Sequence, residues 1–507
     1  MPPKPSIAGK LDNIQGDIWS KGFPKYYETY YFFSIKTPLL NEKNLFSQCL
    51  KNLSTQSPRL ISTLRMVRED HNRISTRRKE EAIKQGIPEK RVVLPEIPMS
   101  NALIAFTIKG LQAIQAGLQD DTSLRLTDVA ATDPAFFAGM TPKEVTALLK
   151  DPDQDTWDPL FRSTEIHGML KIGGSSKGKV EEHLKNIKGV LKHGTAIDDV
   201  FQDSPSTPTD SRVDGWTRPN DRGKEHFGFE DGISQPLMNG IDEQEPGTNA
   251  NTDVNMYTDP RLLIVTGDTK RESSIPRPPW MENGSFLVFR KLEQNVKAFE
   301  DLTEQWEKKG CESKEHMGAK LMGRWKSGAP LAVVNFYTED SKDPDKAKEM
   351  NNFIYENEVC PVSAHIRKTN LREDLTENDK DPRALRTKII RNGIPYGTDY
   401  KGNENNTKLT RGLLFACYQA HIEDGFQNMQ VNWSNDSTFR TGHPGQDPII
   451  GQVAQKSRGV NGDLETFFND KFGVRQSVKF QQLVTMKGGE YFFVPSIPAM
   501  SDDLGMT

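Results

Sequence analysis

Cysteine is scarce in this chain of 507 residues. The four cysteines lie far apart and form no Cys-x-x-Cys pair: Cys49, Cys311, Cys360 and Cys417. Their spacing argues against both a disulfide-stabilised fold and a zinc site. No apolar run is long enough to span a bilayer, and the first residues lack the apolar segment of a secretory signal. We therefore expect no membrane partner, and either a protein that is not exported by that route or one whose leader has been removed.

Several signatures of known binding and catalytic sites are absent as well. Neither GxxxxGK[ST] nor GxGxxG occurs between a strand and a helix, which argues against a nucleotide site. GxSxG and HExxH are also missing, and the nine histidines are scattered, so an ordinary hydrolase and a multi-histidine metal site have little support. The net charge is -4, from 66 Lys and Arg against 70 Asp and Glu. This balance indicates no nucleic-acid partner and no anionic membrane.

Short apolar segments recur along the chain with the length and composition of β-strands. They cover residues 30–36, 102–108, 165–172, 285–290, 412–418 and 489–494, and segments with helical spacing cover 39–53, 180–191, 294–306 and 420–430. Residues 64–92 are strongly charged and predict an exposed helix or loop. We predict an α+β fold of two related units, each an antiparallel sheet with helices on one face. Because a chain this long favours two domains, we place the units at residues 1–240 and 241–507.

The segment Gly228-Phe-Glu-Asp-Gly-Ile-Ser-Gln-Pro236 holds an acid pair between two glycines. Glycine is used where the backbone needs φ > 0 or where something approaches the main chain closely. The pattern is therefore typical of an Asp231 carboxylate presented to a cavity by a bent backbone. A surface Asp-Gly turn is the alternative, although the apolar Phe229 and Ile233 favour a segment that enters the core.

Two later segments place a polar side chain among small or apolar neighbours. His365 precedes three cations within seven positions, which suits a surface or capping residue, or else a ligand with Arg367 or Arg372 binding carboxylates. Arg391 stands between an apolar pair and Gly393, so it needs either an anion or a buried acid as its partner. The residues alone leave both alternatives open.

These segments resemble, in order, the conserved blocks of the dye-decolorizing peroxidases, a family of haem enzymes. Residues 228–232 match the family's GxxDG motif, and the segments around His365 and Arg391 resemble two further blocks. Residues 412–419 and 488–493 resemble the remaining blocks, and residues 11–17 resemble the start of fungal members. The resemblance covers nearly the whole chain. It implies duplicated ferredoxin-like α+β domains, with haem b held in the C-terminal half facing the GxxDG segment.

The resemblance also implies which residues hold the haem. His365 would be the proximal iron ligand, and Asp447 is the candidate for the acid that orients its ring. Arg372, and with it Arg367, would pair with the haem propionates. Two apolar residues of the 412–419 block would contact the haem: Leu413 and Phe415.

On the distal side, Asp231 and Arg391 would cleave hydrogen peroxide. Asp231 would move a proton between the two peroxide oxygens, and Arg391 would stabilise the developing negative charge. The products implied by the family are a ferryl haem and a porphyrin radical. Because an aspartate titrates near ~4 and a histidine near ~6.5, an aspartate base predicts an acid-shifted activity optimum. Arg222 and His226 have the spacing of another peroxidase class, and we treat that spacing as coincidence.

Dyes and phenolic compounds would then be oxidised by one-electron steps. Bulky dyes cannot enter a buried haem pocket, and Trp433 and Tyr396 resemble positions from which fungal members relay electrons outwards. Ordinary packing is the alternative for both aromatic residues. Asp399 and Glu404 offer hard oxygen ligands for Mn(II), and a solvated loop is the alternative there. Two rival functions are a haem-handling protein with incidental peroxidase activity and an α+β interaction protein without haem.

Overall fold

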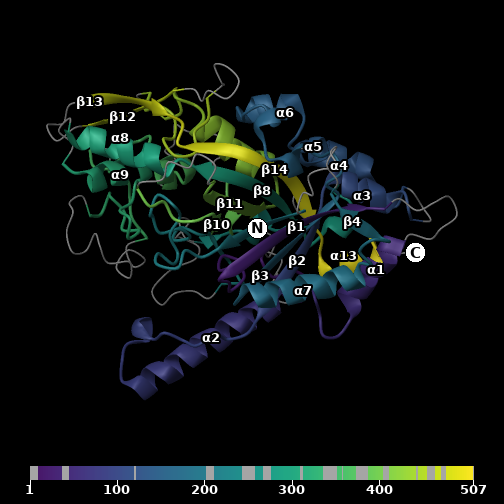
Figure 1. Ribbon diagram of the computed structural model, residues 1–507. Coiled ribbons are helices and arrows are strands. Elements are labelled where there is room, and N and C mark those ends of the chain that lie inside the picture. Colours follow the sequence, from purple (N-terminus) through teal and green to yellow (C-terminus); the bar gives the residue numbers. More distant parts are fainter. Residues whose placement is uncertain are drawn as a thin grey trace.

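The computed structural model describes residues 10–36, 45–118, 122–200, 211–242, 257–266, 276–308, 312–334, 351–356, 358–372, 386–402, 410–440, 443–453, 463–469 and 475–505. A twisted antiparallel sheet runs through its centre, with helices on both sides (Figure 1). Among these described residues, no helix is both long enough and apolar enough to span a bilayer.

Ten strands form the central sheet, and their hydrogen-bonded order is β10-β11-β8-β14-β2-β3-β1-β4, with β5 paired to β1 and β9 paired to β11. The strands are β1 (Tyr27–Ile35), β2 (Ser100–Phe106), β3 (Gly168–Gly174), β4 (Ile197–Asp199), β5 (Arg212–Trp216), β8 (Ser285–Gln294), β9 (Ile390–Arg391), β10 (Ile394–Tyr396), β11 (Gly412–Gln419) and β14 (Val484–Val494). Two small sheets lie outside it and pair β6 (Leu237–Met238) with β7 (Tyr257–Thr258), and β12 (Asp463–Asn469) with β13 (Arg475–Gln481).

The helices pack against this sheet or extend its ends. They are α1 (Leu45–Thr55), α2 (Leu64–Gln85), α3 (Ile108–Gln115), α4 (Leu126–Thr132), α5 (Pro134–Ala138), α6 (Lys143–Leu149), α7 (Lys177–Val190), α8 (Val296–Lys308), α9 (Lys314–Met322), α11 (His365–Thr369) and α13 (Ile497–Asp502). Helix α2 projects from the body of the protein (Figure 1) and is mostly exposed, as the charge of residues 64–92 predicts. Its start is capped by the Thr63 side chain, which accepts from Met66 N, and Gly86 ends it with φ 65°.

The predicted α+β fold with antiparallel strands is confirmed. All six strands expected from the apolar segments are present, and the helices expected near 39–53, 180–191 and 294–306 are α1, α7 and α8. Residues 37–44 lie outside the described part, so α1 is described from Leu45. The sequence did not predict that the sheets of the two halves join. Phe493 of β14 pairs with Phe106 of β2, and α13 packs on α1, so the end of the chain returns to the N-terminal half. The boundary near residue 240 stays a prediction.

Residues 423–434 form a π-helix where the sequence predicts an α-helix over 420–430. Its hydrogen bonds include i→i−5 pairs: Gln427 N donates to Ile422 O, and Asn435 N donates to Gln430 O, each at 2.9 Å. A wider helix places side chains at angles that a 3.6-residue period does not predict, and π-helical turns are frequent at functional sites. This one carries Phe426 and Met429 on one side and Trp433 near its end.

A buried polar cluster joins the first described residues to the strand that carries Arg391. The ammonium of Lys171 lies 2.5 Å from Asp17 Oδ2 and donates to Asn392 O at 2.7 Å. The Asn392 side chain donates in turn to Asp17 O at 2.6 Å and to Trp19 O at 2.9 Å. Burial acts to lower the pKa of Lys171, but Asp17 and Glu28 outweigh it and raise this pKa. The charge is thus fully paired, as a buried ion must be.

Candidate active site

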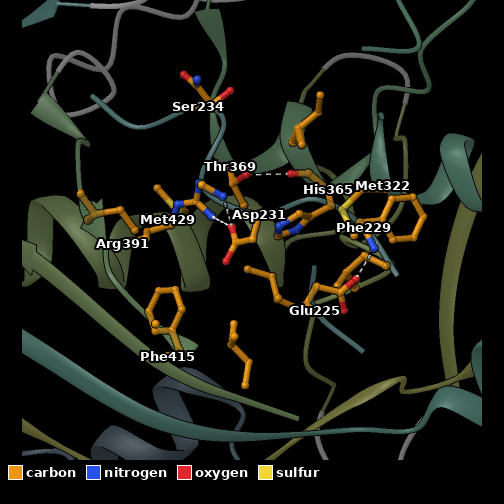
Figure 2. A pocket seen from close by; sticks show the side chains of 18 of the residues that line it. Glu225, Phe229, Asp231, Ser234, Met322, His365, Thr369, Arg391, Phe415 and Met429 are labelled. Atoms are coloured by element: carbon orange, nitrogen blue, oxygen red, sulfur yellow. Dashed lines mark hydrogen bonds and ion pairs between the residues drawn. The ribbon is translucent and has the colours of Figure 1, made fainter. Parts of the chain in front are cut away.

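A large cavity lies between the segment 228–236, helix α11, strand β11 and the π-helix (Figure 2). It encloses about 1840 Å³, counting the space at its open mouth. Much of its lining is apolar: Phe229, Met322, Leu413, Phe415, Phe426, Met429 and Ile449.

His365 begins helix α11 and extends its imidazole into the cavity (Figure 2). Its Nδ1 lies 2.8 Å from Oδ2 of Asp447, which is completely buried. The other oxygen, Oδ1, accepts from the backbone N–H groups of Ile449 at 2.8 Å and Ile450 at 3.1 Å. Because the carboxylate can only accept, Nδ1 carries the proton and Nε2 keeps a lone pair for a metal. The acid partner predicted from the sequence therefore lies where that role requires it.

Asp231 and Arg391 meet in the same cavity (Figure 2). Arg391 Nη1 donates to Asp231 Oδ1 at 3.1 Å, and Gly232 N donates to the same oxygen at 2.6 Å. The flanking glycines have φ of 93° at Gly228 and 78° at Gly232, a backbone region that other residues rarely adopt. The Asp231 side chain is 38% exposed and the Arg391 side chain 29% exposed. The bent segment thus presents a carboxylate to open space beside a guanidinium.

Three further cations gather near the cavity without a carboxylate partner among the described residues. Arg324 is 4% exposed and donates to Gly328 O, Ser234 Oγ and Asn351 Oδ1. Burial lowers the pKa of Arg324 to about 10, and burial together with Arg372 lowers the pKa of Lys388 to about 8. Arg372 shares Asn351 Oδ1 with Arg324, and its buried Nε has no partner in the described structure. Buried positive charge that has no carboxylate partner among the described residues is suited to an anionic ligand.

Arg324 and Lys388 line the cavity, whereas Arg367 and Arg372 do not. Arg367 is buried and donates to Cys360 O at 2.7 Å. The sequence reasoning missed both lining cations. Lys388 stands three residues before Arg391, so the same block carried a signal for it, but Arg324 lies outside every block that was recognised.

The predicted electron-transfer residues are both buried. Trp433 is 4% exposed and stacks on Phe439, with ring centroids 5.7 Å apart and an angle of 11° between the planes. Tyr396 is 5% exposed, its hydroxyl has no hydrogen-bond partner in the described structure, and burial raises its pKa. Neither aromatic ring lines the cavity. A relay role for either residue stays a prediction.

The predicted Mn(II) ligands are not brought together by the described structure. Asp399 forms an ion pair with Arg218 Nε at 2.6 Å, and Glu404 lies outside the described residues. Arg222 packs over the ring of Tyr26, and His226 is buried with Nε2 2.8 Å from Tyr396 O. Since neither lines the cavity, the spacing of Arg222 and His226 is a coincidence, as the sequence reasoning held.

These features fit an iron porphyrin. One imidazole offers an unprotonated nitrogen to a mainly apolar cavity. The cations near it that have no carboxylate partner in the described structure suit carboxylate side chains of a ligand. In the part of the chain that is described, no group of three or more His, Cys, Asp and Glu side chains could hold a bare metal ion.

Comparison with known proteins agrees with this chemistry. Residues 13–205 match the family described as DyP dimeric alpha+beta barrel domain, and residues 255–440 match Dyp-type peroxidase, C-terminal. A dye-decolorizing peroxidase of Auricularia auricula-judae is 31% identical over 99% of this chain and 90% of its own length. Peroxidase 2 of Mycetinis scorodonius is 31% identical over 99% of this chain and 89% of its own length.

Solved structures show the same likeness. A variant of the dye-decolorizing peroxidase from Pleurotus ostreatus is 28% identical, with a TM-score of 0.76 over 98% of this chain and 99% of its own. An ancestral D-type dye-decolorizing peroxidase is 34% identical, with a TM-score of 0.72 over 97% of this chain and 99% of its own. The chain belongs to the dye-decolorizing peroxidases, haem-containing oxidoreductases that use hydrogen peroxide.

Proposed function

We propose that this chain is a peroxidase that binds haem b through His365, cleaves hydrogen peroxide with Asp231 and Arg391, and oxidises aromatic dyes and phenolic compounds. The observation that carries the proposal is the 3.1 Å contact between Arg391 Nη1 and Asp231 Oδ1 in the cavity that His365 enters. When bound, haem supplies the iron at which the peroxide O–O bond breaks and stores the oxidising equivalents.

Asp231 has the free oxygen that a proton carrier needs. Its Oδ1 already accepts from Arg391 and Gly232, whereas Oδ2 makes no hydrogen bond to any residue that the structure describes. Oδ2 takes the proton of the incoming peroxide and returns it to the leaving oxygen. Arg391 holds the carboxylate in place and stabilises negative charge on the departing oxygen.

The proximal side prepares His365 for its iron. Asp447 keeps the proton on Nδ1 and makes the opposite nitrogen more basic, as carboxylates do behind metal-bound imidazoles. When haem is bound, its propionates would be neutralised by Arg324 and Lys388, which line the cavity, together with Arg367 and Arg372, which do not line it. Leu413 and Phe415 line the apolar part of the cavity and exclude water from the haem faces.

For the reducing substrates we propose that Trp433 carries electrons outwards, because it lies in the π-helix whose residues Phe426 and Met429 line the cavity. A Mn(II) site at Asp399 and Glu404 stays a prediction, since Asp399 is paired with Arg218. A haem-handling role does not require the Asp231–Arg391 pair, and an interaction protein without haem does not account for the cavity.

The test begins with a Soret band, which the protein must show after purification or addition of haem. Asp231→Asn is then mixed with hydrogen peroxide in stopped flow. We expect its reaction to be slower by about 10²- to 10⁴-fold, the usual contribution of a positioned acid–base group. Asp221→Asn is a matched control, because Asp221 does not line the cavity. Failure to take up haem, or an unchanged rate in Asp231→Asn, would overturn the proposal.

A further inference from the structure

The main chain of Arg391 is held by the side chain of Gln235. Arg391 N donates to Gln235 Oε1 at 3.1 Å, and Gln235 Nε2 donates to Arg391 O. Strand β9 is two residues long, and it pairs with β11 through Arg391↔Cys417 and Ile390↔Tyr418. Its other edge would present an unpaired N–H and C=O at residue 391. A primary amide carries both a donor group and an acceptor group, so Gln235 pairs with this edge as a neighbouring strand would.

Gln235 belongs to the same short segment as Asp231. Three hydrogen bonds therefore connect this segment to one residue. Two lie between the Gln235 amide and the main chain of Arg391, and in the third the Arg391 guanidinium donates to Asp231. The segment thus holds the main chain of Arg391 and also contacts its guanidinium. Among described residues, Asp231 is the sole ion-pair partner of Arg391. The Arg391 side chain is long and 29% exposed, and this is its one ion pair with a described residue. The position of the guanidinium therefore depends on where the main chain of Arg391 is held.

The residue after Arg391 is anchored separately. Asn392 N donates to Ala416 O, its carbonyl accepts from Lys171 and Lys25, and its amide donates to Asp17 O. These bonds hold the strand against β11 and the first described residues. They do not tie it to the segment 228–236. Among the described side chains, Gln235 is the one that links the main chain of Arg391 to that segment.

We propose that Gln235 is a positioning residue that sets the separation of Arg391 and Asp231, and through it the rate of peroxide cleavage. The inference rests on the proposed function, in which these two side chains act on peroxide. Misplacement of a catalytic group by about 1 Å can cost on the order of 100-fold in rate. Without Gln235, residue 391 keeps its pairing to β11 but is released from the segment that carries the carboxylate.

The test uses the haem-loaded protein and Gln235→Leu, which removes both hydrogen bonds at similar volume. We expect the second-order rate constant for peroxide to fall by about 10- to 100-fold. We also expect weaker binding of fluoride, followed at equilibrium by the haem absorption spectrum, because a fixed cation stabilises an anion at the iron. The KM for the dye should not change. The side chain of Gln235→Asn is one methylene shorter. Its peroxide rate constant and its fluoride affinity should lie between those of Gln235→Leu and of the parent protein.

Two further variants serve as the negative and the positive control. Gln154→Leu removes another amide that donates to a backbone carbonyl, that of Thr141, away from the cavity. It should leave the peroxide rate and the fluoride affinity unchanged. Arg391→Ala should impair both. If Arg391→Ala is impaired while both Gln235 variants stay within about twofold of the parent, the inference is wrong and the proposed function stands. If Arg391→Ala is also unimpaired, the proposed function itself fails. If Gln154→Leu lost as much peroxide rate and fluoride affinity as Gln235→Leu, the effect of Gln235 would be one of general stability. That result would overturn the inference.

Discussion

Asp447 Oδ2 accepts a 2.8 Å hydrogen bond from His365 Nδ1, and the carboxylate that makes it is completely buried. The other oxygen is already saturated by two backbone N–H groups. The pair therefore has a single arrangement in which the acid accepts and the imidazole donates. This contact fixes both the orientation and the tautomer of the ring.

Asp447→Asn should disrupt this arrangement with little change of volume. The new amide oxygen can still accept from Ile449 and Ile450, which leaves an NH₂ group facing His365 Nδ1. The imidazole must then carry its proton on Nε2, where the iron should bind. We expect haem affinity to fall by about 10- to 100-fold, measured by titrating the haem-free protein and following the Soret band. Asp436→Asn, at a half-buried turn, is the control; equal affinity in both variants would contradict the role of Asp447.

The buried His226 should make the folded protein less stable in acid. Burial lowers its pKa to about 4, opposed by the Tyr396 carbonyl and assisted by Arg218. In the unfolded chain its pKa is ~6.5, so between these values the unfolded state binds a proton that the folded state does not. Stability is therefore lost as pH falls through this window, by roughly 2.5 kcal/mol at pH ~4.5. His226→Gln keeps a donor for Tyr396 O, and urea unfolding at pH 7 and 4.5 should show a smaller loss than in the parent. Identical losses would show that His226 is not responsible.

Haem binding should take up a proton at Lys388. Burial and Arg372 lower the pKa of Lys388 to about 8, and a propionate beside it would raise that pKa again. Above pH ~8 the haem-free protein must gain a proton in order to bind, so haem affinity should fall by up to about tenfold per pH unit until pH ~10. Lys388→Met should abolish this dependence. Lys479→Met, an exposed control, should keep it. If the haem affinity of the parent protein did not change with pH, a contact between Lys388 and a propionate would be contradicted.

Tyr396→Phe should be neutral or stabilising. The hydroxyl is buried without a partner in the described structure, and removal of an unsatisfied polar group relieves a desolvation cost of about 1–3 kcal/mol. The buried phenol also has no acceptor for the proton that oxidation would release. We expect an unchanged or higher melting temperature in thermal unfolding. A selective loss of dye oxidation would instead establish Tyr396 as a redox residue.

Trp433→Phe should slow the oxidation of bulky dyes by about tenfold or more while the peroxide step keeps its rate. Trp433 lies in the π-helix that lines the cavity and stacks on Phe439, which is partly exposed. Steady-state rates with a bulky dye, compared with stopped-flow rates of the peroxide step, separate the two effects. Equal slowing of both steps would point to packing alone.

The strands and the paired residues of the site were predictable because their signals are local. Alternating or continuous apolar runs mark β1, β8 and β14, and short blocks mark Asp231, His365 and Arg391. Asp447 was found only through the family resemblance. What could not be predicted depends on contacts between distant segments. The amide of Gln235 meets Arg391 across 156 residues. The π-helix differs from an α-helix in its i→i−5 hydrogen bonds, which the apolar pattern of residues 420–430 did not indicate.

The bond from Asn392 to Asp17 O closes a loop of 375 residues, and it lies one position from the distal arginine. Loops of that length form late, because the chain must order most of itself before their contacts contribute. A fragment that begins at residue 241 would retain His365, Asp447 and Arg391 but lose Asp231, Gln235 and the anchors of Asn392. We expect such a fragment to bind haem without cleaving peroxide.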